Sequence, residues 1–213
     1  MSRVPYQMAD AAAAKIIKRL RQEFRHNRLS LFDEMNVLAV RKHVEKLYAN
    51  AYKIIKREFV AILSPLAEEL YAEALAMGFD GNIRELGEAW VDVFFGKYNP
   101  VTRYVFLNEL DRKEARLFEA LVASSDDRQQ SYKTAENLLI KQVKQYAGDL
   151  EDEITKVVYK DAGVKMVQWV AELYHKTCDT CSGLDGIVFS IEDAPDKQHY
   201  HCRCYLVPVK EGE

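Results

Sequence analysis

Residues 37–63 read VLAVRKHVEKLYANAYKIIKREFVAIL, and this stretch decides the fold class. Its apolar residues recur at steps of 4, 3, 4, 4, 4 and 3 positions. This spacing places them on one face of an α-helix. At about 1.5 Å per residue the helix would extend on the order of 50 Å, so we expect a mainly α-helical protein with a long-helix body. The stripe consists of Val40, Val44, Leu47, Ala51, Ile55, Phe59 and Ile62.

Two helices are expected to flank this stripe. Tyr6 to His26 has a strongly helical composition, and Asn27 is expected to end that helix. Ser30 is a suitable N-cap for the long helix, which we expect to run to Ser64. Pro65 can occupy the first turn of a separate helix over residues 66–77, which Gly78 would end.

Further helices are expected downstream. Asn82 should open a short helix around Trp90, and the run Gly96-Lys-Tyr-Asn-Pro100 should end it. A helix from about Arg103 to Val122 should follow. Asp126 or Asp127 can cap another long helix, whose apolar stripe again has helical steps. That stripe consists of Tyr132, Ala135, Leu139, Val143, Tyr146, Leu150, Ile154 and Val157.

The apolar period changes from helical to alternating near the C-terminus. Val167, Trp169, Ala171 and Leu173 occupy alternate positions, which is typical of a strand, although a helix remains possible over so short a run. Residues 187–189 and 204–207 are two further strand candidates. We therefore expect two domains: a helical body over residues 1–161, and a small C-terminal α+β or β-hairpin domain over residues 162–213.

Composition excludes several classes of protein. The chain has 213 residues, 48% hydrophobic and 30% charged, with a net charge of −3, which is typical of a globular protein and not of a disordered one. No apolar run approaches the roughly 20 residues that cross a bilayer. The first twenty residues have no long apolar core, so we expect no secretory signal and no membrane association.

The balanced net charge conceals a strong asymmetry along the chain. Residues 1–60 hold thirteen Lys and Arg against six Asp and Glu, a net charge of +7, which leaves −10 for residues 61–213. A basic N-terminal region can approach a polyanion. The cluster from Lys15 to Arg28 lacks the interleaved aromatic residues of a single-strand binder, and a solvated helix face is the favoured interpretation. A weak DNA contact through this region is therefore an open alternative.

All four cysteines lie in the last 36 residues, together with a histidine, in the pattern C-x2-C-x17-H-x2-C-x-C. Thiolates are soft ligands that suit Zn²⁺, and two of them separated by two residues can bind one ion from a tight turn. The segment is too small and polar to be stabilised by apolar burial alone, so a structural zinc ion has a physical purpose. The candidate ligands are Cys178, Cys181, His199, Cys202 and Cys204.

Disulfides, a redox pair and unrelated buried cysteines are less favoured interpretations of this cluster. Disulfides are unexpected in a reducing cytosol, and a redox C-x-x-C pair normally follows the first strand of a βαβ unit. Four unrelated buried cysteines would not cluster in this way. Five candidates compete for four positions around zinc, so either His199 with Cys202 or Cys202 with Cys204 can complete the set, and His201 could replace His199. His175, His26 and His43 are expected to be ordinary polar residues.

The C-terminal motifs resemble a known module. They are Trp169-Val-Ala-Glu-Leu173, Thr177-Cys-Asp-Thr-Cys181, Leu184-Asp-Gly186 and His199-Tyr-His-Cys-Arg-Cys204. In this order they resemble the C-terminal domain of phage minor head proteins, also called head morphogenesis or MuF-type proteins. Tyr200 stands where that family usually has proline. Lys133-Thr-Ala-Glu-Asn137 is similar to a polar stretch of the family's helical region.

The resemblance implies a minor capsid protein of a tailed phage or prophage. Such a protein would be made in the bacterial host cytoplasm, would associate with the portal inside the capsid of the virion, and would act in head assembly or genome delivery. It would not be an enzyme, and the sequence shows no Gly-rich phosphate loop, G-x-S-x-G elbow or H-E-x-x-H helix. The alternative function is a helical DNA-binding protein with a basic N-terminal arm and a structural zinc module.

Overall fold

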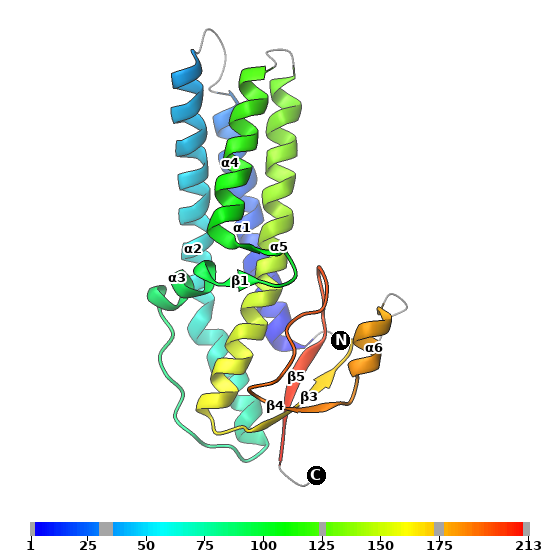
Figure 1. Ribbon diagram of the computed structural model, residues 1–213. Coiled ribbons are helices and arrows are strands. Elements are labelled where there is room, and N and C mark those ends of the chain that lie inside the picture. Colours follow the sequence, from blue (N-terminus) through cyan, green and yellow to red (C-terminus); the bar gives the residue numbers. More distant parts are fainter. Residues whose placement is uncertain (1–2, 30–35, 124–126, 173–176, 211–213) are drawn as a thin grey trace.

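Four long helices form the body of the molecule. The computed structural model describes residues 3–29, 36–123, 127–172 and 177–210. Helices α1 (Val4–Leu29), α2 (Val37–Ala76), α4 (Phe106–Ala123) and α5 (Arg128–Asp161) lie side by side and run alternately up and down (Figure 1). The expected class is confirmed: a mainly helical protein with a small strand-containing region at its C-terminus.

The predicted apolar stripes form the core of this bundle. Leu47, Ala51 and Ile55 of α2 are completely buried, and so are Leu139 and Val143 of α5. Each buried Leu, Ile or Val side chain stabilises the fold by about 1.5–3 kcal/mol relative to an exposed one. The stripes therefore account for the close packing of α1 against both α2 and α5.

The prediction that Pro65 begins a separate helix was wrong. Helix α2 is 40 residues long, from Val37 to Ala76, and Pro65 lies inside it. A proline inside a helix costs about 3 kcal/mol because it removes one backbone hydrogen bond and its ring crowds the preceding turn. Leu63, Leu66 and Leu70 on either side are completely buried, and their packing outweighs that cost. The tertiary core, which the local pattern does not reveal, therefore decides the length of α2.

The helix boundaries differ from the prediction at several other places. Helix α1 continues past Asn27, whose side-chain amide donates a hydrogen bond to the carbonyl oxygen of Glu23 at 2.8 Å. Asn36 caps α2 by accepting a hydrogen bond from the Ala39 N–H at 2.9 Å. Asp127 precedes α5 without a side-chain capping bond. Ser30 and Asp126 lie outside the described residues.

The short helix α3 (Glu88–Gly96) begins later than predicted, at Glu88 and not at Asn82. The preceding loop is held across the end of α5: Arg84 pairs with Asp161 and its own N–H donates to the same carboxylate at 3.0 Å. The Gly81 N–H also donates to the carbonyl oxygen of Ala162 at 3.1 Å. A Cβ atom at Gly81 would lie 2.4 Å from the carbonyl oxygen of Asp161, so only glycine permits this approach.

A small hairpin replaces the expected start of the next helix. Strands β1 (Tyr98–Asn99) and β2 (Tyr104–Val105) pair before α4 begins at Phe106, so the predicted start at Arg103 was wrong. Asn99 organises the turn: its side-chain oxygen accepts from the N–H groups of Val101 and Thr102, both at 2.9 Å. Arg103 has a positive φ of 62°, which a helix start cannot contain.

The C-terminal region contains a three-stranded antiparallel sheet in the order β4-β3-β5. Its strands are β3 (Met166–Val170), β4 (Val188–Ser190) and β5 (Tyr205–Val209). The predicted alternation is confirmed, since Val167 and Trp169 of β3 are completely buried. The two later strands lie within one or two residues of the predicted ranges. Leu173, the last position of the predicted alternation, lies outside the described residues.

A buried network of charged groups joins this sheet region to the bundle, and Lys197 lies at its centre. The Lys197 ammonium is 3.2 Å from a carboxylate oxygen of Asp152 on α5, and it donates to the Tyr6 hydroxyl and the Cys204 carbonyl oxygen. Tyr6, near the start of α1, donates to the same carbonyl at 2.8 Å. Burial alone would lower the pKa of Lys197, but Asp152, Tyr6 and Glu151 outweigh it and raise that pKa.

Arg3 forms a second part of the same network. Its guanidinium lies 3.1 Å from Glu151, donates to the Tyr159 hydroxyl at 2.7 Å, and pairs with Glu73 near the end of α2. Tyr159 also donates to Glu73 at 2.7 Å. The network therefore connects α1, α2, α5 and the loop before β5 through groups that are largely removed from water.

Replacing Lys197 should destabilise the whole protein. In Lys197→Met the side-chain volume remains similar, but Asp152 and Glu151 lose a buried counter-charge. Breaking one partner of a buried pair costs about 3–5 kcal/mol, so the free energy of unfolding should fall by about that amount. Urea denaturation followed by circular dichroism measures it. Lys160→Met, at an exposed pair with Glu192, is the matched control and should change stability by less than about 1 kcal/mol. An equal effect of the two substitutions would contradict the importance of the network.

Candidate metal centre

The first two cysteines lie at the start of a short helix. Helix α6 (Asp179–Leu184) begins directly after Cys178, and the Cys178 sulfur accepts a hydrogen bond from the Cys181 N–H at 3.4 Å. This contact bends the chain so that both sulfurs lie on one side of the turn. The sequence predicted the tight turn but not the helix, because six residues containing Gly183 carry no helical apolar pattern.

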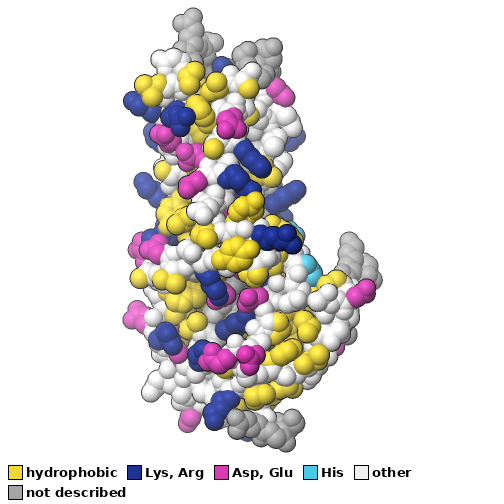
Figure 2. Space-filling model, viewed as in Figure 1, with side chains coloured by type: hydrophobic (Ala, Val, Ile, Leu, Met, Phe, Trp, Pro, Cys, Tyr) yellow, Lys and Arg dark blue, Asp and Glu magenta, His cyan; other side chains and the backbone are white. Residues whose placement is uncertain are grey.

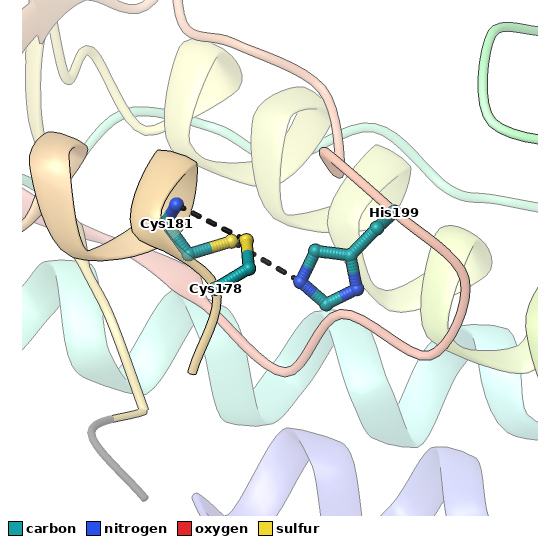
Figure 3. Close-up of side chains that lie close together, drawn as sticks. All are labelled: Cys178, Cys181 and His199. Carbon is teal, nitrogen blue, oxygen red and sulfur yellow. Dashed lines mark hydrogen bonds between the residues drawn. The ribbon is translucent and has the colours of Figure 1, made fainter. Parts of the chain in front are cut away.

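The remaining candidates come from the loop between β4 and β5. This loop brings His199, Cys202 and Cys204 back beside α6 from about twenty residues away in the sequence. Two groups of ligand atoms result, each with all members within 4.8 Å of one another. One contains Cys178, Cys181 and His199 (Figure 3), and the other contains Cys181, Cys202 and Cys204. Each of the five predicted side chains therefore belongs to at least one group, and Cys181 belongs to both.

Three of the clustered side chains lie in direct contact with one another. The Cys181 sulfur lies 3.3 Å from Nε2 of His199 and 3.7 Å from the Cys202 sulfur. All four cysteines are free thiols. A disulfide has an S–S distance of about 2.05 Å, so the Cys181–Cys202 contact is not one. Cys181, Cys202 and Cys204 are buried, and the cluster could hold a metal ion.

Hydrogen bonds prepare one of these sulfurs to act as a thiolate. The Cys204 thiol donates to Cys202, and together with the positive charge of Lys197 this lowers the pKa of Cys202 to about 5. Burial raises the pKa of Cys181 to about 12, and its neighbours Cys178 and Cys202 act in the same direction. A metal ion binds thiolates and releases their protons, so a lowered pKa of Cys202 favours binding of a metal ion at its sulfur.

The orientation of His199 also suits a metal ligand. Its Nδ1 lies 3.0 Å from the carbonyl oxygen of Tyr200, to which Nδ1–H can donate, and its Nε2 points toward the sulfurs (Figure 3). Metal-binding histidines are commonly held by such a second hydrogen bond. His201, the alternative ligand suggested by the sequence, is in neither ligand group. His175 lies outside the described residues.

Several residues outside the cluster hold it in place, and the sequence alone did not identify their roles. Asp185 accepts a hydrogen bond from the Ala171 N–H at 2.8 Å, which fastens the end of α6 to β3. Gly186 has a φ of 78° and donates to the Trp169 carbonyl oxygen at 2.9 Å. Lys197 and the Gln145 side chain, which accepts from the His201 N–H at 2.8 Å, hold the opposite loop. The Leu-Asp-Gly spacing was the only sequence signal for any of them.

A scan against protein-family models, a search of curated proteins and a search of solved structures each found no match. Within the described ranges, no helix is long and apolar enough to cross a membrane.

Removing Cys181 should abolish metal binding more completely than any other single substitution, because this residue belongs to both ligand groups. We expect about one metal ion per purified chain, and close to none in Cys181→Ser, measured by elemental analysis. His201→Ala changes a histidine of the same loop that lies outside both groups, and it should retain the ion. Full metal content in a Cys178→Ser/Cys181→Ser double variant would contradict the site.

Proposed function

We propose that this chain is a minor head protein of a tailed phage or prophage, which binds the portal inside the capsid and acts by binding, not by catalysis. The observation that carries the proposal is the C-terminal unit. The Trp-bearing strand, the C-x-x-C turn, the Leu-Asp-Gly turn and the His-Cys loop carry the sequence resemblance, and they pack together as one assembly.

We propose that the ion in this unit is structural Zn²⁺. Ligands about 2.3 Å from zinc at the corners of a tetrahedron lie roughly 3.8 Å apart, close to the 3.7 Å between the sulfurs of Cys181 and Cys202. We propose that four of the five sulfur and nitrogen donors, which form two groups of three around the shared Cys181, bind the ion and leave no open position for a substrate. A closed site of this kind supports a structural role for the metal.

A band of exposed apolar side chains offers a surface for the portal. It crosses the middle of the bundle over α3, the β1–β2 hairpin and α4 (Figure 2), and we call it the apolar band. Val93 is 72% exposed, Tyr98 58% and Leu107 37%. Protein interfaces bury aromatic and apolar side chains at their centre, so this band is where we place the portal contact. The band consists of Val93, Tyr98, Tyr104 and Leu107.

Co-purification with a portal protein tests this function. The chain should be produced together with the portal encoded beside it and captured through an affinity tag on the portal. An interface with an apolar centre should persist at about 1 M salt. Val93→Ser/Leu107→Ser should weaken the binding at least about tenfold, because each buried apolar side chain contributes roughly 1.5 kcal/mol or more.

The matched control is Val37→Ser/Leu38→Ser at the N-terminal end of α2. These residues are 56% and 61% exposed, so the double variant makes the same chemical change on a comparably exposed surface outside the apolar band. It should bind the portal as the unsubstituted chain does. Failure of the unsubstituted chain to bind any portal would refute the proposed function. Equal losses of portal affinity in both double variants would refute only the placement of the portal contact at the apolar band.

A second proposed function is contact with DNA, either beside portal binding or in place of it. The specific observation in its favour is that several cations of α1 are exposed and have no acidic partner within 4 Å among the described residues. Lys18 and Arg25 are examples. Such cations can bind phosphate without the energetic cost of breaking an existing ion pair.

A further inference from the structure

The basic residues of α1 divide into two faces with different surroundings. Lys15 and Arg19 point toward α2, where they lie 2.7 and 3.1 Å from the buried carboxylate of Glu58. Arg57 of α2 lies 3.3 Å from the same carboxylate. Three cations therefore share one buried acid, and this side of α1 is already partly neutralised by the protein.

A second face of α1 lies toward α5 and remains strongly basic. Lys18, Arg21, Arg25 and Arg28 follow one another at steps of 3, 4 and 3 residues, so they form one stripe along the helix. Of these four, only Arg21 has an acidic partner within 4 Å among the described residues, namely Glu136 of α5 at 3.7 Å. The stripe extends about 15 Å at 1.5 Å per residue.

Helix α5 supplies the second wall of a groove. One hollow of about 360 Å³ is lined by Arg21, Arg25, Arg28 and Lys133, and the next, of about 440 Å³, by Lys18, Arg21, Arg25 and Lys144. The two hollows share Arg21 and Arg25, so they form one groove. In Figure 2 dark blue side chains also gather along the edge of the bundle, next to histidine side chains.

The metal-binding loop contacts α5 next to the groove. Gln145, next to Lys144 on α5, accepts a hydrogen bond from the His201 N–H at 2.8 Å. Arg203, two residues further along that loop, pairs with Asp10 of α1 at 2.9 Å. The loop that bears His199 and Cys202 is therefore fastened both to α5, next to Lys144 of the groove, and to α1.

We propose that the groove between α1 and α5 binds the phosphate backbone of nucleic acid without reading its sequence. This inference rests on the proposed DNA contact and assigns it a site. The cations form a regular row along α1, which suits the regularly repeating charges of a polyanion. Duplex DNA carries one negative charge per about 1.7 Å of its axis. An anionic membrane is a poorer fit, because the apolar residues of α1 that could insert into it, such as Ile16, Leu20 and Phe24, are buried in the bundle.

Fluorescence anisotropy with a labelled 30-base-pair duplex tests the site in the full-length chain. Two duplexes of unrelated sequence should bind equally, and affinity should fall steeply between 50 and 200 mM salt. Lys18→Gln/Lys144→Gln removes one cation from each wall, so the slope of log affinity against log salt should decrease by about two. The control Lys42→Gln/Lys46→Gln removes the same charge from exposed positions of α2 that line neither hollow, and it should keep the slope unchanged.

Three results would contradict the proposal that this groove binds DNA. Absence of duplex binding at 50 mM salt would refute the DNA contact as a whole, and portal binding would remain a separate question. Equal losses in the two double variants would show that only net charge matters. Binding to vesicles containing phosphatidylserine that depends on Lys18 and Lys144, with no binding to DNA, would assign the groove to a membrane surface.

Discussion

The fold depends on one buried cation. Lys197 lies in the loop before β5, is 5% exposed, and meets groups from both ends of the chain: Tyr6 of α1, Asp152 of α5 and the Cys204 carbonyl. Charges removed from water are tolerated only when they are paired and hydrogen-bonded. Each member of the network therefore requires the others, and this requirement fixes where the C-terminal sheet region sits on the bundle. Apolar packing of helices alone would not specify that position so narrowly.

The candidate metal centre and this network act on the same segment. His199 and Cys202 lie between Lys197 and Cys204, so the loop is held on one side by buried charges and on the other by the thiol and imidazole cluster. The loop has little apolar surface of its own, and both sets of contacts substitute for a hydrophobic core. The same loop also contacts α5 at Gln145, next to Lys144 of the basic groove.

Most of the fold could be predicted from the sequence because the spacing of apolar residues within one helix or strand depends only on neighbouring residues. The stripes of α2 and α5, the alternation in β3 and the clustering of Cys and His were all visible in residue spacing. The predicted helix boundaries were wrong where contacts between residues distant in the sequence outweigh the local preference. Pro65 remains helical because Leu63 and Leu66 pack in the core, and Asn82 starts no helix because Arg84 is held by Asp161. Spacing alone did not predict the role of Lys197, since a single lysine in a polar loop carries no pattern.

Hydrogen–deuterium exchange, measured by mass spectrometry with and without a tight metal chelator, tests most directly whether the metal centre and the buried network hold the loop together. Removing the ion should accelerate exchange in residues 177–206 and, through the bond from Tyr6 to the Cys204 carbonyl, in the first turns of α1. The middle of α2, whose stripe is completely buried, should exchange as slowly as before. Unchanged exchange at the start of α1, despite complete loss of the ion, would contradict this coupling.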